Sequence, residues 1–138
     1  MEAEVDWAKD YVFLGSDEAG HTIVFDSDAD KGVERGMSPM RALLTCLGAC
    51  SGMDVVAVLR KRKQDLTALR VQMTGVRNAF GNPKPFTAIS LKYTVTGRGL
   101  ERRYVDEAVK GSIEKYCSVA ATIGGKAKIQ YSYDLLEG

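Results

Sequence analysis

The stretch from Ser38 to Lys63 constrains the fold more than any other part of the chain. Serine is a good helix N-cap and proline suits the first helical position, so Ser38-Pro39 predicts the start of a helix. Between Ala42 and Leu59 the sequence is apolar almost without interruption, which indicates a helix buried on most sides. At 1.5 Å per residue, a helix that reaches Lys63 would be roughly 37 Å long.

A chain of 138 residues can hardly bury such a helix completely by itself. One interpretation is a two-fold homodimer, in which small residues along the helix let another backbone approach closely. These residues are Thr45, Cys46, Gly48, Ala49, Ser51 and Gly52. The other interpretation is a helix covered by the sheet of its own chain, and both stay open here. Asp54 interrupts the apolar run, which fits a buried helix better than a membrane span.

Composition and charge exclude several classes of protein. The length predicts a single domain over residues 1–138, and 45% apolar residues are enough for a core. Nineteen Lys+Arg against eighteen Asp+Glu give no general attraction to nucleic acid or to an anionic membrane. The acidic N-terminus lacks the apolar core of a signal peptide, so we expect a cytoplasmic protein with reduced thiols.

The hydrophobic periodicity predicts an α+β fold. Residues 2–7, 11–14 and 21–25 are expected to form an antiparallel meander, and residues 27–37 a mobile polar loop. Two strands are expected at 66–76 and 86–96, the second with Ile89, Leu91, Tyr93 and Val95 on one face. A helix is expected after the break at 97–99, then a short helix at 117–123 and a last strand at 127–135. The helical pattern places Val105, Ala108, Val109, Ser112, Ile113 and Tyr116 on one face. This order of elements predicts antiparallel sheet rather than an alternating doubly wound fold.

The three cysteines are the main candidates for chemistry. Cys50 lies in the middle of the long helix, where a cysteine commonly serves as a small apolar filler and becomes reactive only beside a cation or hydrogen-bond donors. Cys46, one turn earlier, is interpreted as a packing residue. Cys117 lies at a helix junction, a suitable place for a thiol with access to solvent and to another cysteine. The single histidine, His21, and the lack of a CxxC or Cys/His cluster give no indication of a metal site.

Several segments together resemble the OsmC/Ohr family of thiol peroxidases, most closely its YhfA-type OsmC-like branch. The segments are Ser38-Pro39-Met40, the run from Gly48 to Val56 around Cys50, the run from Glu114 to Val119 around Cys117, and Gly20-His21. The resemblance covers essentially the whole chain. It implies an intertwined homodimer, with antiparallel sheets wrapped around two long central helices and the active sites at the subunit interface.

The resemblance also implies a chemistry. Cys50 would attack an organic hydroperoxide and become a sulfenic acid, and Cys117 would condense with it to a disulfide. A dithiol reductant, lipoyl-linked or a small thiol, would restore both thiols by exchange. No metal or organic cofactor is implied.

The residues that activate the thiol are harder to assign. Well-studied members of the family supply an arginine from the loop before the long helix and a glutamate near the start of that helix. This chain has Arg41 where the close branch usually has an acid. Arg35 and Arg41 are therefore the candidate activating residues, and His21 and Glu114 are further candidates for the substrate site. Because Arg41 lies about 13 Å along the helix from Cys50, it would have to serve the partner's site.

Two other functions compete with the peroxidase. The first is a redox-sensing or small-molecule-binding protein with little turnover, suggested by the missing acid and by Asp54 one turn from Cys50. The second is a structural dimer in which the cysteines only pack.

Overall fold

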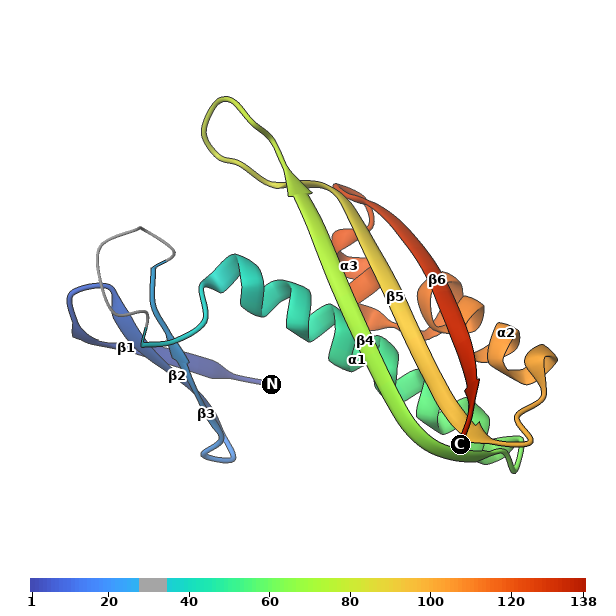
Figure 1. The fold of residues 1–138 in the computed structure, drawn as a ribbon. Helices are drawn as coiled ribbons and strands as arrows, with labels where there is room; N and C mark the ends of the chain where they lie inside the picture. Colours follow the sequence, from blue (N-terminus) through green and yellow to red (C-terminus); the bar gives the residue numbers. More distant parts are fainter. Residues whose placement is uncertain (28–34) are drawn as a thin grey trace. The chain divides into compact units, whose positions relative to one another are not determined.

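The computed structural model describes residues 1–27 and 35–138, in two compact units, Met1–Leu43 and Leu44–Gly138. In the N-terminal unit, β1 (Ala3–Lys9), β2 (Val12–Asp17) and β3 (Thr22–Phe25) form an antiparallel sheet in the order β1-β2-β3 (Figure 1). The predicted meander is therefore confirmed. Most of the loop predicted at residues 27–37 lies outside the described residues.

The long helix α1 runs from Pro39 to Lys61. Ser38 is its N-cap, since its Oγ accepts the backbone N–H of Arg41 at 3.4 Å. One face is fully buried, with Leu47, Ser51, Val55 and Leu59 following each other at four-residue intervals. The opposite face is open, and Met53 is 72% exposed. A single chain therefore buries one side of α1, and burial of the other side by a second copy stays a prediction.

The C-terminal unit contains a second sheet, in the order β4-β5-β6, made of β4 (Asp65–Arg77), β5 (Phe86–Arg98) and β6 (Lys128–Glu137). Strands β4 and β5 are antiparallel, but β6 pairs with β5 in parallel, which corrects the prediction of purely antiparallel sheet. The reason is the connection, because three helical segments carry the chain back to the end of the sheet where β5 begins. The predicted inward face of β5 is confirmed, since Ile89, Leu91, Tyr93 and Val95 are buried.

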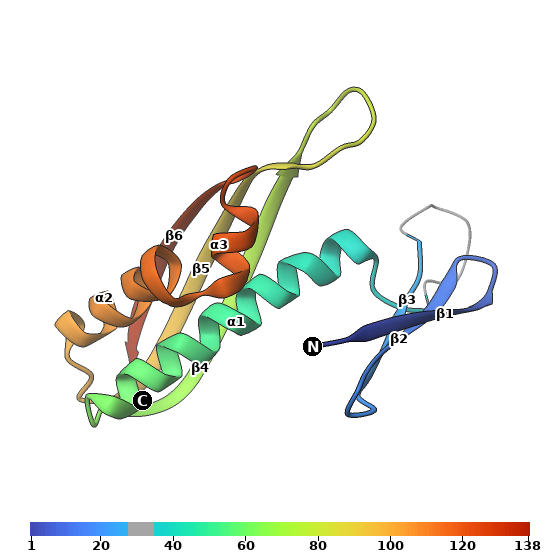
Figure 2. The same cartoon turned by 180° about the vertical axis from the view of Figure 1, so that it is seen from behind.

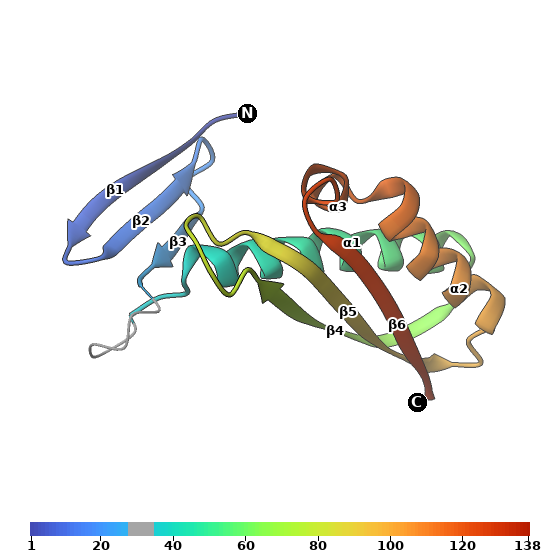
Figure 3. The same cartoon turned by 90° about the horizontal axis from the view of Figure 1, so that it is seen from above.

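The helices of this unit are α2 (Arg102–Gly111), a π-helical turn η1 (Ser112–Tyr116) and α3 (Ser118–Ile123). Figure 2 and Figure 3 show that they lie on the same face of the β4-β5-β6 sheet as α1. The predicted face of α2 is buried as far as Ser112, but Tyr116 is 51% exposed. The π-helical turn inserts an extra residue, so Tyr116 rotates away from the buried face.

Packing against β4 explains two of the small residues in α1. A Cβ atom at Gly48 would overlap the sulfur of Met73, and one at Gly52 would meet Val71 at 3.7 Å. These glycines therefore let α1 approach the sheet of its own chain, which is the second of the two interpretations that the sequence left open. By length and composition α1 could cross a membrane. Its fit to the sheet and its buried polar Ser51 instead make it a core helix of this fold.

Candidate functional site

The structure brings Cys50 and Cys117 together. Cys50 lies on α1 and Cys117 immediately before α3, yet their two sulfur atoms and a carboxylate oxygen of Asp54 all lie within 4.8 Å of one another. All three cysteines are free thiols. Cys50 is half-buried, whereas Cys117 is only 3% exposed. The expectation that Cys117 is open to solvent is therefore wrong, although its access to a second cysteine is confirmed.

The π-helical turn determines where Cys117 lies. The N–H of Cys117 donates to the carbonyl oxygen of Ser112 at 2.8 Å, which closes a wide turn. Cys117 then adopts an extended conformation, with φ −69° and ψ 107°, and acts as the N-cap of α3. Its sulfur accepts the backbone N–H of Ala120 at 3.3 Å. The chain therefore leaves α2, turns the thiol inward and starts a new helix.

Burial determines the protonation of Cys117. It raises the pKa of this thiol from an ordinary value of 9.0 to about 11, and the neighbouring Cys50 adds to the rise. The hydrogen bond from Ala120 acts in the opposite direction but is weaker. At neutral pH Cys117 is therefore a neutral thiol, suited to a second step that follows the activation of another sulfur.

A buried polar network runs behind the two thiols. Ser51 Oγ is hydrogen-bonded to the hydroxyl of Tyr93 and, at 2.7 Å, to the hydroxyl of Ser112. The Ser112 hydroxyl also lies 2.9 Å from Asp54 Oδ2 and can donate to it. Burial raises the pKa of Tyr93 to about 12, so its hydroxyl stays protonated and can act as a donor. The network holds the Asp54 carboxylate beside the sulfur atoms.

Most of this network was not predicted from the sequence. Ser112 stood out only as a polar residue on an apolar helix face, and Tyr93 only as part of a buried strand face. Asp54 was noted only for its position one turn from Cys50, and the structure places its carboxylate close to both sulfur atoms. The useful signal was the spacing of Cys50 and Asp54, because residues four apart share one face of a helix.

The other predicted site residues are described by the contacts that they make within their own units. Glu114 on η1 accepts a hydrogen bond from the Tyr131 hydroxyl at 2.8 Å. In the N-terminal unit, Arg35 pairs with Asp10 at 3.1 Å. Arg41 is exposed in the first turn of α1.

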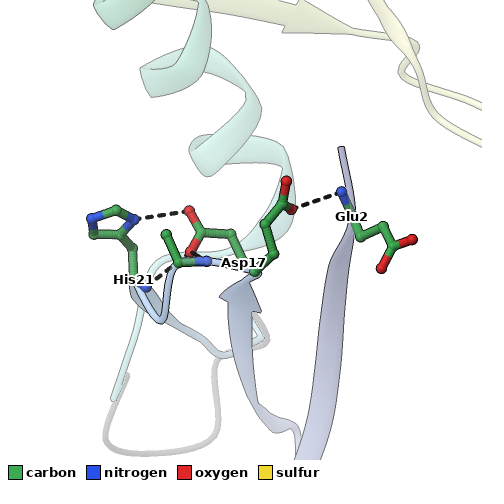
Figure 4. A network of polar contacts seen from close by, with 5 residues as sticks. Glu2, Asp17 and His21 are labelled. Atoms are coloured by element: carbon green, nitrogen blue, oxygen red, sulfur yellow. Dashed lines mark hydrogen bonds and ion pairs between the residues drawn. The ribbon is translucent and has the colours of Figure 1, made fainter.

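His21 belongs to a polar turn of the N-terminal sheet. Its Nδ1 atom lies 2.9 Å from Asp17 Oδ2, and its backbone N–H donates to the same carboxylate (Figure 4). The side-chain hydrogen bond is the main reason that the pKa of Asp17 is lowered. These contacts stabilise the turn between β2 and β3.

Cys46 is exposed on the open face of α1. Within one chain it does not pack against other residues as predicted, because the sheet covers only the opposite side of the helix. It therefore lies outside the group formed by Cys50, Asp54 and Cys117.

Comparison with known proteins gives a consistent result. Residues 29–132 match the family model described as OsmC-like protein. The chain is 38% identical to Protein YhfA of Escherichia coli K12 over 136 residues, which are 99% of this chain and 98% of that protein.

Solved structures share the fold. An OsmC-like protein from Mycoplasma pneumoniae superimposes with a TM-score of 0.84 at 17% identity, covering 98% of this chain and 96% of the other. The organic hydroperoxide resistance protein OhrB of Bacillus subtilis gives a TM-score of 0.66 at 15% identity, covering 97% and 98%. At these identities the two structures establish the fold alone.

Proposed function

The chain belongs to the OsmC-like protein family, and from this premise we propose that it is a cysteine-based thiol peroxidase that reduces organic hydroperoxides to alcohols. The observation that carries the proposal is the approach of Cys50 Sγ and Cys117 Sγ to within 4.8 Å. A disulfide requires about 2.05 Å, so small side-chain movements would join the two sulfur atoms. The name of the structurally similar OhrB, an organic hydroperoxide resistance protein, supports the choice of substrate.

Cys50 performs the first step. It is the more accessible of the two thiols, whereas Cys117 is buried and protonated at neutral pH. The Cys50 thiolate attacks the terminal oxygen of the hydroperoxide, the O–O bond breaks, and the alkoxide takes a proton and leaves as the alcohol. Cys50 is oxidised to a sulfenic acid and the peroxide is reduced.

Cys117 performs the second step. Its sulfur attacks the sulfenic sulfur of Cys50, the S–O bond breaks, and water leaves as the disulfide forms. Cys117 must lose its proton for this attack, and the Asp54 carboxylate is close enough to accept it after a small movement. A dithiol reductant, lipoyl-linked or a small thiol, then restores both cysteines by thiol–disulfide exchange.

Activation of Cys50 needs a positive charge. A thiolate is stabilised by a neighbouring cation, and a cation here would also balance the charge of the Asp54 carboxylate beside the thiols. Arg35 and Arg41 are the candidates in this role, from either subunit of a dimer. Glu114 and His21 remain candidates for contact with the substrate.

In this proposal the protein is a cytoplasmic homodimer. Every residue of β1 is exposed, including Val5 and Trp7, and the N-terminal sheet carries an apolar hollow of about 490 Å³. The open face of α1 is also apolar, as Met53 shows. Apolar surface of this extent is typical of a protein interface, and a second copy of the chain is the partner that the family resemblance implies.

Asp54 also favours a second candidate function. A carboxylate beside the two thiols, in place of a cation, suits a redox-sensing or small-molecule-binding protein with little peroxidase turnover. In that case the disulfide would form slowly, or only with strong oxidants.

One experiment separates these functions. The reduced protein is treated with one equivalent of a bulky organic hydroperoxide, and its disulfides are mapped by mass spectrometry. We expect rapid pairing of Cys50 with Cys117, with an equivalent amount of alcohol released. The Cys50→Ser variant should not consume peroxide, Cys117→Ser should accumulate a sulfenic acid, and Cys46→Ser serves as the control with wild-type behaviour. Two intact thiols after the treatment would refute the peroxidase.

A further inference from the structure

The group formed by Cys50, Asp54 and Cys117 has the composition of a metal site as well as that of a redox site. Its two sulfur atoms and one carboxylate oxygen lie within 4.8 Å of one another. Around a tetrahedral zinc ion, with bonds of about 2.0 to 2.3 Å, neighbouring ligand atoms are roughly 3.5 Å apart. The three side chains would therefore need to approach one another by about 1 Å. Rotation about side-chain bonds can supply such a movement.

The surrounding contacts hold two of the three ligands in place. Ser112 Oγ lies 2.9 Å from Asp54 Oδ2 and is itself bonded to Ser51, so the carboxylate is oriented by a buried network. A carboxylate has two oxygens and can keep this hydrogen bond while it binds an ion. Cys117 is held by its position before α3 and by the N–H of Ala120. Such outer contacts are what orient ligands in metal sites.

We propose that Cys50, Asp54 and Cys117 bind a thiophilic divalent cation of the zinc class, and that a bound ion withdraws both thiols from redox exchange. Two sulfur ligands select zinc or cadmium over magnesium or calcium, which prefer oxygen ligands. Three protein ligands leave one coordination position for water or another small molecule. Half-buried Cys50 and Asp54 provide the side from which the ion enters.

Charge also favours a cation at this place. Binding converts two thiols into thiolates and releases two protons to solvent. The divalent ion then neutralises two of the three negative charges, a more favourable state than thiolates beside a carboxylate without a counter-ion. Because both thiols lose their protons when the ion binds, affinity should rise with pH.

Metal and peroxide would compete for the two thiols, and this competition rests on the proposed peroxidase function. The ion protects the thiols, while oxidation of both thiolates to the disulfide removes two ligands. In that reaction one hydroperoxide takes two electrons and two protons, and alcohol, water and the free cation are released. Metal binding itself requires no peroxidase activity.

The test titrates the reduced, metal-free protein with cobalt(II) as a spectroscopic probe, in the absence of peroxide and air. We expect one ion per chain, with a thiolate-to-cobalt charge-transfer band and the visible bands of a tetrahedral site. Zinc should displace the cobalt, with release of protons measured on binding. A shortfall in stoichiometry, or octahedral spectra without the charge-transfer band, would overturn the proposal.

Matched variants identify the ligands. Cys50→Ser and Cys117→Ser should each remove the tetrahedral spectrum, whereas Cys46→Ser should bind like wild type, because Cys46 lies outside the group. Ser112→Ala should weaken zinc binding by about tenfold or more, and Asp54→Asn at least as much. Unchanged binding in Asp54→Asn, or equal loss in Cys46→Ser, would show adventitious binding by thiols. Circular dichroism of each variant checks that it is folded, and peroxide turnover of the metal-free protein is measured separately.

Discussion

Removal of the Ser51 hydroxyl tests the buried network behind the thiols. The Tyr93 side chain is 0% exposed, and its hydroxyl is hydrogen-bonded to Ser51 Oγ. In the Ser51→Ala variant this hydroxyl loses that partner in a place that water does not reach. Leaving a buried polar group unpaired costs about 1 to 3 kcal/mol, so we expect the free energy of unfolding to fall by about 2 kcal/mol.

The Tyr93→Phe variant should be milder. It removes the buried hydroxyl itself, and Ser51 keeps its bond to Ser112 at 2.7 Å. We expect a loss of about 1 kcal/mol, the net value of one hydrogen bond. The double variant contains no unpaired tyrosine hydroxyl, so it should lose about 2 kcal/mol rather than the sum of about 3, which gives a coupling of about 1 kcal/mol.

The measurement is urea unfolding of the reduced proteins, followed by far-ultraviolet circular dichroism at one protein concentration. Ser90→Ala, on the exposed face of β5, serves as the control and should combine additively with Tyr93→Phe. If the effects of Ser51→Ala and Tyr93→Phe add to within about 0.5 kcal/mol, the two hydroxyls are not coupled and the reasoning is refuted.

Three further predictions concern pH, packing and assembly. Because the folded state raises the pKa of Cys117 from 9.0 to about 11, the unfolded chain loses this proton first as the pH rises. The free energy of unfolding should therefore fall by up to about 3 kcal/mol between pH 9 and pH 11. Urea unfolding measures this fall, which should be smaller in Cys117→Ala. Gly97→Ala should lower the melting temperature and cost about 1 to 3 kcal/mol, because the added Cβ would overlap the backbone oxygen of Asp65. Gly125→Ala is the control and should leave the melting temperature unchanged, because its added Cβ meets open space. If the proposed homodimer forms, Met53→Lys should shift its sedimentation toward monomer, because it places a charge on the apolar face of α1. Sedimentation identical to that of wild type would exclude this face from the proposed interface.

Local pattern predicted most of the elements. The alternation in β5 and the capping residues Ser38-Pro39 before α1 determine structure through neighbours in sequence, and both predictions are confirmed. The direction of β6 was predicted wrongly because pairing depends on where a long connection returns the chain, which periodicity does not record. The exposure of Tyr116 depends on a π-helical turn, which the pattern of apolar residues at helical spacing did not reveal.

Some features of the candidate site were likewise predictable from the sequence, and others were not. Two cysteine motifs in the order and at the separation typical of the OsmC-like family can be read directly from the chain, and so can the shared helix face of Cys50 and Asp54. The burial of Cys117 beside them, and the network through Ser112 that holds the carboxylate, become visible once the helices pack on the sheet. Such contacts join side chains more than fifty positions apart, and the packing of helices on a sheet, rather than local backbone preference, brings them together.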